Sequence, residues 1–253
     1  MLIPPRLGFI ALLMVIPSLH AADLAKGLAA VERKQWREAF AQFEPLAKRG
    51  DPRAEINLGN LYMRGLGVEQ DYAQAFSWYA RAARGGHPTG QAKLGMLYFL
   101  GLGLNENHAE AARWFRKAAE KGESGAAMAL AAMYEQGDGV ERNPVEAYVW
   151  YSIATDLGKQ DGLDQKTRLA DELSPAQLNI ALTQINVWRE QYDKHLPDTA
   201  ASLAEPIIDL QRQTSTEKSP RGKKRRKPAD TGNEGSASQG VNSGLGAGLE
   251  GKP

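Results

Sequence analysis

A period of 36 residues runs through the middle of this sequence without an insertion or a deletion. A leucine, a tyrosine four positions later, a glycine and a tryptophan each recur at this step, at Leu58, Leu94 and Leu130, Tyr62, Tyr98 and Tyr134, Gly65, Gly101 and Gly137, and Trp78, Trp114 and Trp150. A fixed period of this length is typical of proteins whose repeated units stack on their neighbours. The repeat therefore restricts the chain to a linear stack of similar units.

Each repeat predicts two helices joined by a glycine turn. Leu58 and Tyr62 lie four residues apart, so they share one face of a first helix over residues 53–64. Gly65 ends this helix, because glycine accepts the left-handed backbone that a helix stop requires. Asp71 is placed to cap a second helix, and an asparagine holds the same position in the next two repeats. The pattern predicts an all-α fold.

The repeats lie between two divergent segments. The full repeats are expected over about 54–89, 90–125 and 126–161, inside a helical domain that spans 23–195. A divergent helix pair is predicted before them over 23–50, and a C-terminal cap after them over 162–195. Divergence is expected at the ends of a stack, because a terminal unit must present a polar face to water.

The predicted C-terminal cap consists of two helices, over 162–173 and 175–192. Ser174 and Gln177 form a capping box with Pro175 at the first helical position. The second helix is expected to bury one apolar stripe, made of Leu178, Leu182, Ile185 and Trp188.

The string A-x3-LG-x2-Y-x2-G-x-GV-x2-D-x3-A-x2-WY-x2-AA-x2-G, complete at residues 54–86, resembles the Sel-one-like repeat (SLR) family, which is related to the tetratricopeptide (TPR) repeats. The resemblance implies a right-handed α-solenoid of antiparallel helix pairs that serves as an adaptor for protein partners. It also implies that the first helix of each repeat lines the inner curve. On that basis the partner-binding groove is expected to contain Ile56, Asn60, Met63, Arg64, Met96, Phe99, Leu100, Met128 and Glu135.

This expected groove is apolar and contains several methionines. Flexible methionine surfaces suit the apolar face of a bound peptide or helix. The alternative is that residues such as Met96, Phe99 and Met128 only pack against adjacent helices.

The N-terminus predicts export. An apolar run from Leu7 to Leu19 follows Arg6, and Ala21 and Ala22 supply small residues for cleavage, as in a secretory signal peptide. The run is too short for a membrane span of about 20 residues. Residues 1–22 are therefore interpreted as a signal peptide, which would leave a periplasmic or secreted chain with no transmembrane segment after cleavage. The alternative is a buried first helix.

The C-terminal segment 196–253 is predicted to be a disordered, basic, glycine-rich tail. Residues 211–253 carry +5, and since the whole chain carries +1 and residues 1–22 carry +1, residues 23–210 carry −5. Such a segment cannot bury enough apolar surface to order itself. Its densest charge cluster is Arg221, Lys223, Lys224, Arg225, Arg226 and Lys227.

Three interpretations of this cluster remain open. It is either a solvated tail, or a contact for an anionic membrane surface or envelope polymer, or a segment that binds nucleic acid or folds back on the acidic body. Nucleic acid is the weakest of these, because the aromatic residues that single-strand binders use for stacking are absent from the cluster.

Signs of catalysis are absent from the sequence. There is no cysteine, no His-x-x-x-His spacing, no phosphate-binding glycine loop and no G-x-S-x-G motif. We therefore expect neither an enzyme nor a bound metal or cofactor. The function expected is a protein–protein interaction scaffold in the bacterial cell envelope that binds a peptide or helix of an envelope protein. The alternatives are a protein that binds or hydrolyses the peptidoglycan polymer, and a peripheral membrane tether that acts through the basic tail.

Overall fold

All regular elements are helical in residues 16–204, the part of the chain that the computed structural model describes; side chains are described over 24–193. The elements are α1 (Ile16–Glu32), α2 (Trp36–Lys48), α3 (Pro52–Arg64), α4 (Tyr72–Arg84), α5 (Pro88–Leu100), α6 (His108–Glu120), α7 (Ser124–Gln136), α8 (Pro144–Asp156), a 3-10 helix η1 (Gln160–Gly162), α9 (Leu163–Glu172) and α10 (Pro175–Ala204). Most of the expected signal peptide and the basic cluster at 221–227 lie outside the described residues.

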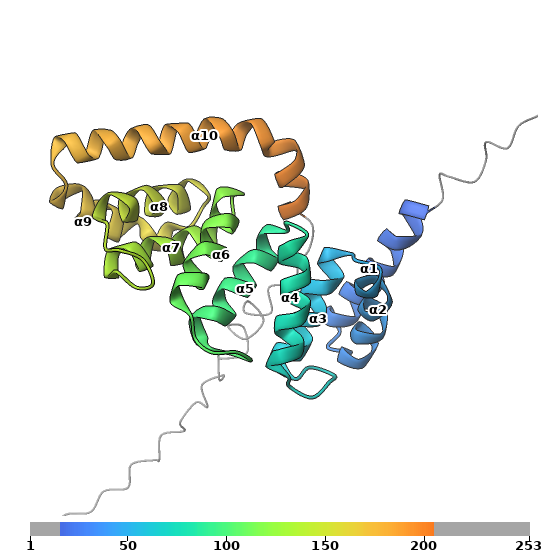
Figure 1. Ribbon diagram of the computed structural model, residues 1–253. Helices are drawn as coiled ribbons and strands as arrows, with labels where there is room; N and C mark the ends of the chain where they lie inside the picture. The colour runs from blue at the N-terminus through green and yellow to red at the C-terminus, as the bar shows by residue number, and fades with distance from the viewer. Residues whose placement is uncertain (1–15, 205–253) are drawn as a thin grey trace, which may run out of the picture. The chain divides into compact units, whose positions relative to one another are not determined.

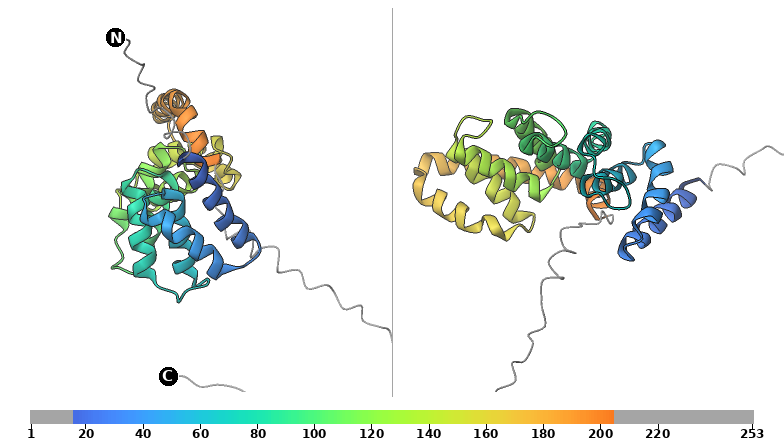
Figure 2. Two further views of the ribbon diagram at one scale, coloured as in Figure 1. Left: turned by 90° about the vertical axis from the view of Figure 1, so that its right-hand side faces the viewer. Right: turned by 90° about the horizontal axis from the view of Figure 1, so that it is seen from below.

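The helices stack in chain order, each one packed against the helix before it and the helix after it, from α1 to α9 (Figure 1). Helices α3 and α4, α5 and α6, and α7 and α8 form the three repeated pairs, and α1 and α2 form the pair that precedes them. Two further views show the same succession of neighbouring helix pairs (Figure 2). The predicted all-α solenoid of helix pairs is confirmed.

The predicted helix ends are also confirmed. The side chain of Asp71 accepts hydrogen bonds from the backbone N–H groups of Ala73 and Gln74, at 2.9 and 3.0 Å. Asn107 and Asn143 cap α6 and α8 in the same way. The first helix of each repeat ends at a glycine with a positive φ of 62–78°, at Gly65, Gly101 and Gly137. Because these bonds join residues close in sequence, the repeat pattern alone could locate them.

The core within a helix pair combines small residues with aromatic rings. Gly59 lies on α3 directly against the ring of Tyr79, which is fully buried on α4. The Tyr79 hydroxyl donates a 2.7 Å hydrogen bond to Oδ1 of Asn60. Burial raises the pKa of Tyr79 far above its usual range, so the phenol stays protonated and can donate. The close approach of α3 and α4 therefore depends on glycine at one position and on a buried polar pair beside it.

The N-terminal pair begins before the expected cleavage site. Helix α1 starts at Ile16, so its backbone runs through Ala21 and Ala22. The part after this site carries the contacts with α2, since Leu24, Leu28 and Val31 are buried there. Cleavage at the expected position would retain all three residues.

The C-terminal cap contains one deviation from prediction. The capping box is present, with Gln177 N–H donating to Oγ of Ser174 at 3.3 Å and Ser174 N–H donating to Oε1 of Gln177 at 3.0 Å. The buried stripe of α10 contains Ala181 instead of Leu182, which is 44% exposed. The prediction of Leu182 as a core residue is therefore wrong.

The physical reason is the phase of the helix. Helix α10 packs on α8, and its positions that face the core follow alternating steps of three and four residues, at Leu178, Ala181, Ile185, Trp188 and Tyr192. The rings of Trp188 and Tyr192 stack at 4.7 Å between centroids. Leu182 follows Ala181 by about 100° around the helix, which turns it toward solvent. Within the described residues, no helix is long and apolar enough to span a membrane.

Candidate partner-binding surface

The structure moves two predicted groove residues into the core of the first repeat. Ile56 has no exposed surface, and Asn60 is 8% exposed and accepts the Tyr79 hydroxyl. Helix α3 packs against α2 and α4 and also contacts α5, so nearly its whole middle is covered. The assignment of Ile56 and Asn60 to a partner-binding groove is therefore wrong.

The last turn of α3 is more accessible. Met63 is partly buried against the core that Tyr62 and Tyr79 share, and Arg64 is exposed beside it. Both precede Gly65, where the helix stops. Of the predicted groove residues on α3, only Met63 and Arg64, in its last turn, are accessible to a partner.

Helix α5 presents the largest apolar exposure among the predicted residues. Leu100, the last residue of the helix, is 51% exposed, while Phe99 and Met96 are partly buried against the core. The Phe99 ring stacks on the imidazole of His108, with 4.6 Å between centroids. We call Met96, Phe99 and Leu100 the α5 surface. Met96 and Phe99 pack in part against adjacent helices, as the alternative interpretation of these residues holds. Half of the Leu100 side chain remains exposed.

His108 holds the neighbouring loops together. Its ring nitrogens pair with Glu106, at 2.6 Å, and with Asp138. The hydrogen bond to Asp138 raises the pKa of His108 above its usual value, and the charge of Glu106 acts in the same direction. The ring that stacks on Phe99 therefore belongs to a histidine whose position is held by two carboxylates.

On α7 the two predicted groove residues, Met128 and Glu135, contact the segment that follows α8. Met128 lies close to Gly162 of η1, so that a Cβ at this glycine would come within 3.1 Å of its terminal methyl group. Glu135 accepts a 2.8 Å hydrogen bond from the Tyr151 hydroxyl and pairs with Arg168 of α9. These contacts raise the pKa of Tyr151, with burial as the largest cause and the Glu135 carboxylate as the next. Met128 and Glu135 thus fasten the third repeat to the helices that follow it.

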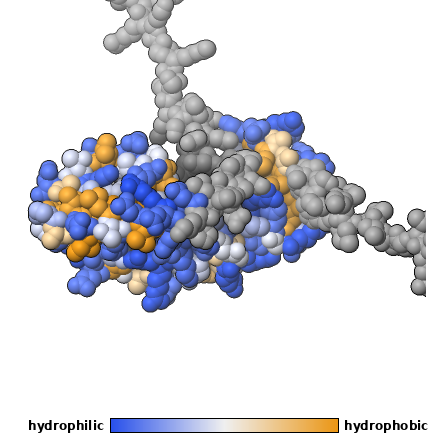
Figure 3. All heavy atoms as spheres, turned by 90° about the horizontal axis from the view of Figure 1, so that it is seen from above, coloured by the Kyte–Doolittle hydropathy of each residue, from blue (hydrophilic) through white to orange (hydrophobic). Residues whose placement is uncertain are grey.

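Four further exposed apolar side chains were not among the predicted site residues. Leu163 of α9 and Ile180, Leu182 and Val187 of α10 are each 44–53% exposed. Apolar residues gather toward the end of the described part where α9 leads into α10 (Figure 3). The sequence signal for the exposed residues of α10 was the number of its apolar residues, which exceeds what one buried stripe can accommodate.

In the described residues, no group of three or more His, Asp or Glu side chains is arranged to hold a metal ion. The arrangement of the α5 surface offers shape and apolar contact, and no pair of groups within it is set up for proton transfer or nucleophilic attack.

Comparisons with known proteins agree with the repeat pattern. The family model for the Sel1 repeat matches residues 52–87, 88–123 and 124–159, three consecutive units of 36 residues. No curated protein sequence matches the chain. Sel1 repeats generally mediate protein–protein interaction, and their fold is a non-catalytic scaffold.

Comparison with solved structures finds similar repeat proteins. A Sel1 repeat protein from Oxalobacter formigenes is 31% identical over 56% of this chain, with a TM-score of 0.55; the chain covers 59% of that protein. A protective antigen present in uropathogenic Escherichia coli strains, which displays an SLR fold, is 24% identical over 85% of this chain and 50% of its own, with a TM-score of 0.42. The chain thus spans about half to three fifths of the length of these two structures.

Proposed function

We propose that this chain, which contains three matches to the Sel1 repeat, is a protein-interaction scaffold of the bacterial cell envelope. We further propose that it binds a peptide or helix of another protein on the α5 surface. The observation that carries the proposal is the exposure of Leu100. Its side chain lies half uncovered at the end of α5, next to Phe99 and Met96, in a fold whose other repeats place Arg64 and Gln136 at the same position.

The repeat itself argues that Leu100 is not needed for folding. A position that faces water in a stack is ordinarily polar, as it is in the first and third repeats. Burying an exposed leucine completely contributes about 1.5–3 kcal/mol, so covering the exposed half contributes roughly 1 kcal/mol to binding. A partner that also covers the remaining surface of Phe99 and Met96 would gain more.

The envelope location is supported by the N-terminal sequence. The apolar run from Leu7 to Leu19, with Ala21 and Ala22 after it, has the layout of a signal peptide. The retained part of α1 still buries Leu24, Leu28 and Val31, so an exported chain that begins near residue 22 keeps its N-terminal helix pair.

The test compares two substitutions of exposed leucines. Leu100→Arg gives the second repeat the residue that the first repeat carries at this position, so the helix end should tolerate it. Leu182→Arg, on the exposed side of α10, is the matched control with the same change of charge and a similar exposure, 44% against 51%. Each variant is used in a crosslinking pull-down from the envelope fraction of the native cells.

The expected result is a protein captured by the wild type and by Leu182→Arg, and lost with Leu100→Arg. The captured protein is then purified and its affinity for the three chains measured directly. If Leu100→Arg binds it as tightly as the wild type does, the α5 surface is not the contact. Circular dichroism confirms that all three chains have the same helix content.

A further inference from the structure

At one end of the stack, the loop inside each full repeat lies against the start of the second helix of the preceding pair. The second glycine of each loop makes this contact, Gly67 with Trp36, Gly103 with Tyr72 and Gly139 with His108. A Cβ added at these glycines would lie 2.4–2.7 Å from the backbone of the contacted residue. The first side chain of each second helix is therefore fixed beside the loop of the next repeat.

The third of these junctions carries charge where the first two do not. Trp36 and Tyr72 begin the second helix in the first two junctions, and a leucine lies between the two glycines of the facing loop. In the third junction the corresponding residues are His108 and Asp138, and Nδ1 of His108 pairs with a carboxylate oxygen of Asp138. A residue that can gain or lose a proton thus joins the second repeat to the third.

Both ring nitrogens of His108 face carboxylates. Nδ1 pairs with Asp138, in the loop after α7, and Nε2 lies 2.6 Å from Oε1 of Glu106, in the loop after α5. A neutral imidazole has one N–H and one lone pair, so it can donate to only one of these carboxylates, and its other nitrogen would face a negatively charged oxygen. The arrangement therefore requires the imidazolium, which donates to both.

The other charged side chains near this ring are paired elsewhere. Glu110 of α6 pairs with Arg113 at 2.6 Å, and Nε of Arg142 donates to a backbone carbonyl of α7 at 3.1 Å. The hydrogen bond with Asp138 is the largest cause that raises the pKa of His108 above 6.5, and the second carboxylate adds to it against a smaller effect of desolvation. The imidazolium is therefore favoured in the folded chain.

The imidazole ring also contacts the α5 surface. Its centroid lies 4.6 Å from that of the Phe99 ring, with 15° between the two planes. A positive charge over an aromatic face gains an electrostatic attraction that a neutral ring lacks. Phe99 lies between Met96 and the half-exposed Leu100 on the last turn of α5. The proton on His108 therefore acts on the two loops and on Phe99 together.

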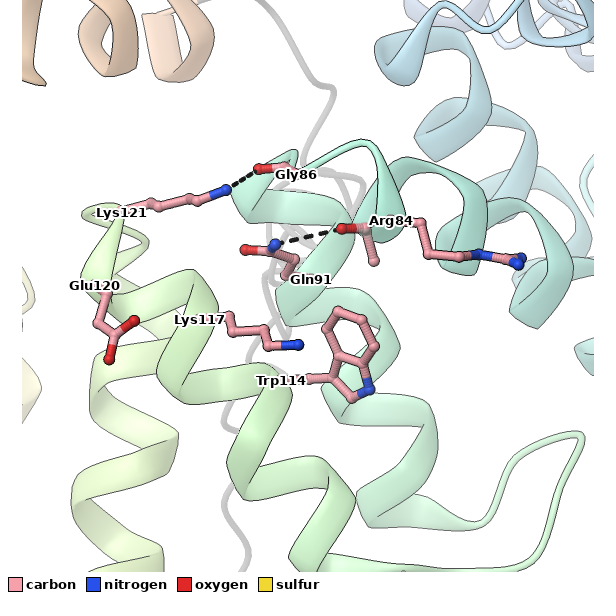
Figure 4. A pocket seen from close by; sticks show the side chains of 8 residues that line it. Arg84, Gly86, Gln91, Trp114, Lys117, Glu120 and Lys121 are labelled. Atoms are coloured by element: carbon pink, nitrogen blue, oxygen red, sulfur yellow. Dashed lines mark hydrogen bonds between the residues drawn. The ribbon is translucent and has the colours of Figure 1, made fainter.

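The opposite end of α6 is joined to the preceding repeat without a histidine. Nζ of Lys121 donates a 2.6 Å hydrogen bond to the carbonyl oxygen of Gly86, in the turn after α4 (Figure 4). Nδ1 of His87, which is buried at the start of α5, has no hydrogen-bond partner in the protein. Among the side chains described, over residues 24–193, His108 is thus the histidine that pairs with carboxylates.

We propose that His108 is a positioning residue of the α5 surface and that its protonation regulates how this surface binds a partner. The imidazolium holds the loops after α5 and α7 and attracts the ring of Phe99. When the pH rises through the pKa of folded His108, one carboxylate loses its donor and the attraction to Phe99 weakens, so the end of α5 becomes less fixed. Binding should be tighter at pH 6 than at pH 9. The inference rests on the proposed function, because it concerns regulation of the same surface.

The first test needs no partner. The full mature chain is labelled with ¹³C at histidine Cε1 and at the methyl groups of leucine and methionine, and NMR spectra are recorded from pH 6 to pH 9. We expect the His108 signal to titrate with a midpoint above 6.5. The methyl signals of Met96 and Leu100 should shift with that same midpoint, because both residues adjoin Phe99 in the last turn of α5.

Two variants and a control assign the effect. His108→Tyr gives the third junction the residue that begins α4, so the methyl shifts between pH 6 and pH 9 should disappear. Asp138→Asn removes the carboxylate with the largest effect and should move the His108 midpoint, and the methyl shifts with it, to lower pH. Asp161→Asn, which removes an exposed carboxylate from η1, should leave the midpoint unchanged.

The second test uses the protein captured in the Leu100 experiment. Its Kd for the wild type should be at least about fivefold higher at pH 9 than at pH 6, which is the lower end of typical coupling between two sites. The Kd for His108→Tyr should change less over the same range. A fall in affinity of equal size in both chains would contradict regulation by His108.

Three results of the NMR titration would overturn the proposal. Methyl signals that stay constant while His108 titrates would show that the imidazole does not position the α5 surface. A His108 midpoint at or below 6.5 would show that the two carboxylates do not favour the imidazolium. Methyl shifts that persist in His108→Tyr would assign them to another group. The Leu100→Arg experiment is independent of these outcomes, since equal binding by that variant would refute the proposed function and leave the NMR result unchanged.

Discussion

His87 makes the stability of this protein depend on pH in a way that can be measured. The residue is 7% exposed at the start of α5, and Nδ1 of its buried imidazole has no hydrogen-bond partner in the protein. Burial, with a smaller contribution from the positive charges of Arg53 and Lys121, lowers the pKa of His87 from 6.5 to about 4, against a weak opposing effect of Asp51.

The direction of the effect follows from the depressed pKa. In the folded chain the imidazole stays neutral until the pH approaches 4, whereas in the unfolded chain it takes up a proton below about 6.5. The free energy of unfolding is therefore unaffected by His87 above pH 6.5 and falls as the pH is lowered from there toward 4. At about 1.4 kcal/mol for each pH unit between the two pKa values, the total loss is about 3 kcal/mol, of which about 2 kcal/mol is reached at pH 5.

The perturbation that isolates this group is His87→Asn. Asparagine does not titrate in this range, and at the same helix position Asp51 and Glu123 accept backbone N–H bonds that His87 does not. We expect the loss of unfolding free energy between pH 7.5 and pH 5 to be about 2 kcal/mol smaller in the variant than in the wild type. For a chain of this size, that difference corresponds to roughly 4–8 °C in Tm.

The assay is urea unfolding followed by circular dichroism at both pH values. His108 is the control, because its raised pKa works in the opposite sense: its protonated form is favoured in the fold, so it adds stability at low pH and loses it as the pH rises through its folded pKa. Repeating the comparison in a His108→Asn background removes that contribution. The same pH dependence in the wild type and in His87→Asn would refute the reasoning, since it would mean that the imidazole is hydrated in the folded chain.

Two further predictions concern the helix packing and the N-terminus. Gly59→Ala should destabilise the fold by about 1–3 kcal/mol, because the added Cβ would lie 2.4 Å from Cε1 of Tyr79. Gly85→Ala, at φ −67° and with the nearest atom 3.4 Å from the added Cβ, should be neutral or add about 0.4–1 kcal/mol of stability. Equal urea midpoints for the two variants would contradict this prediction. Mass spectrometry of the protein from the periplasmic fraction should give a mature chain that begins at Ala22 or Asp23, and recovery of the chain with residues 1–21 still attached would count against export by a cleaved signal peptide.

The sequence alone determined the helix pairs, their order and most of their ends. These features depend on contacts between residues close in the chain, such as the bonds from Asp71 to the next helical turn, or on positions repeated at a step of 36. A capping box or a glycine stop acts within a few residues, so its pattern is complete in the sequence.

Which side of each helix faces water was decided by the tertiary structure. A helix in the middle of a stack is contacted by the neighbours on both sides, so its buried stripe is wider than an amphipathic pattern predicts. For that reason Ile56 and Asn60 are buried although they lie off the predicted stripe. On α10, where one partner helix is present, the burial of Ala181 in place of Leu182 followed from the phase in which α10 meets α8.

The burial of Gln91 also required the tertiary structure. Glutamine at this position of a repeat carries no signal of its own, because Glu55 and Ala127 hold the same position in the neighbouring repeats. The carbonyl of Ala83 on α4 accepts a hydrogen bond from Nε2 of Gln91 and so orients the amide on α5. Such a contact escapes a sequence pattern because orientation and burial are properties of the assembled stack.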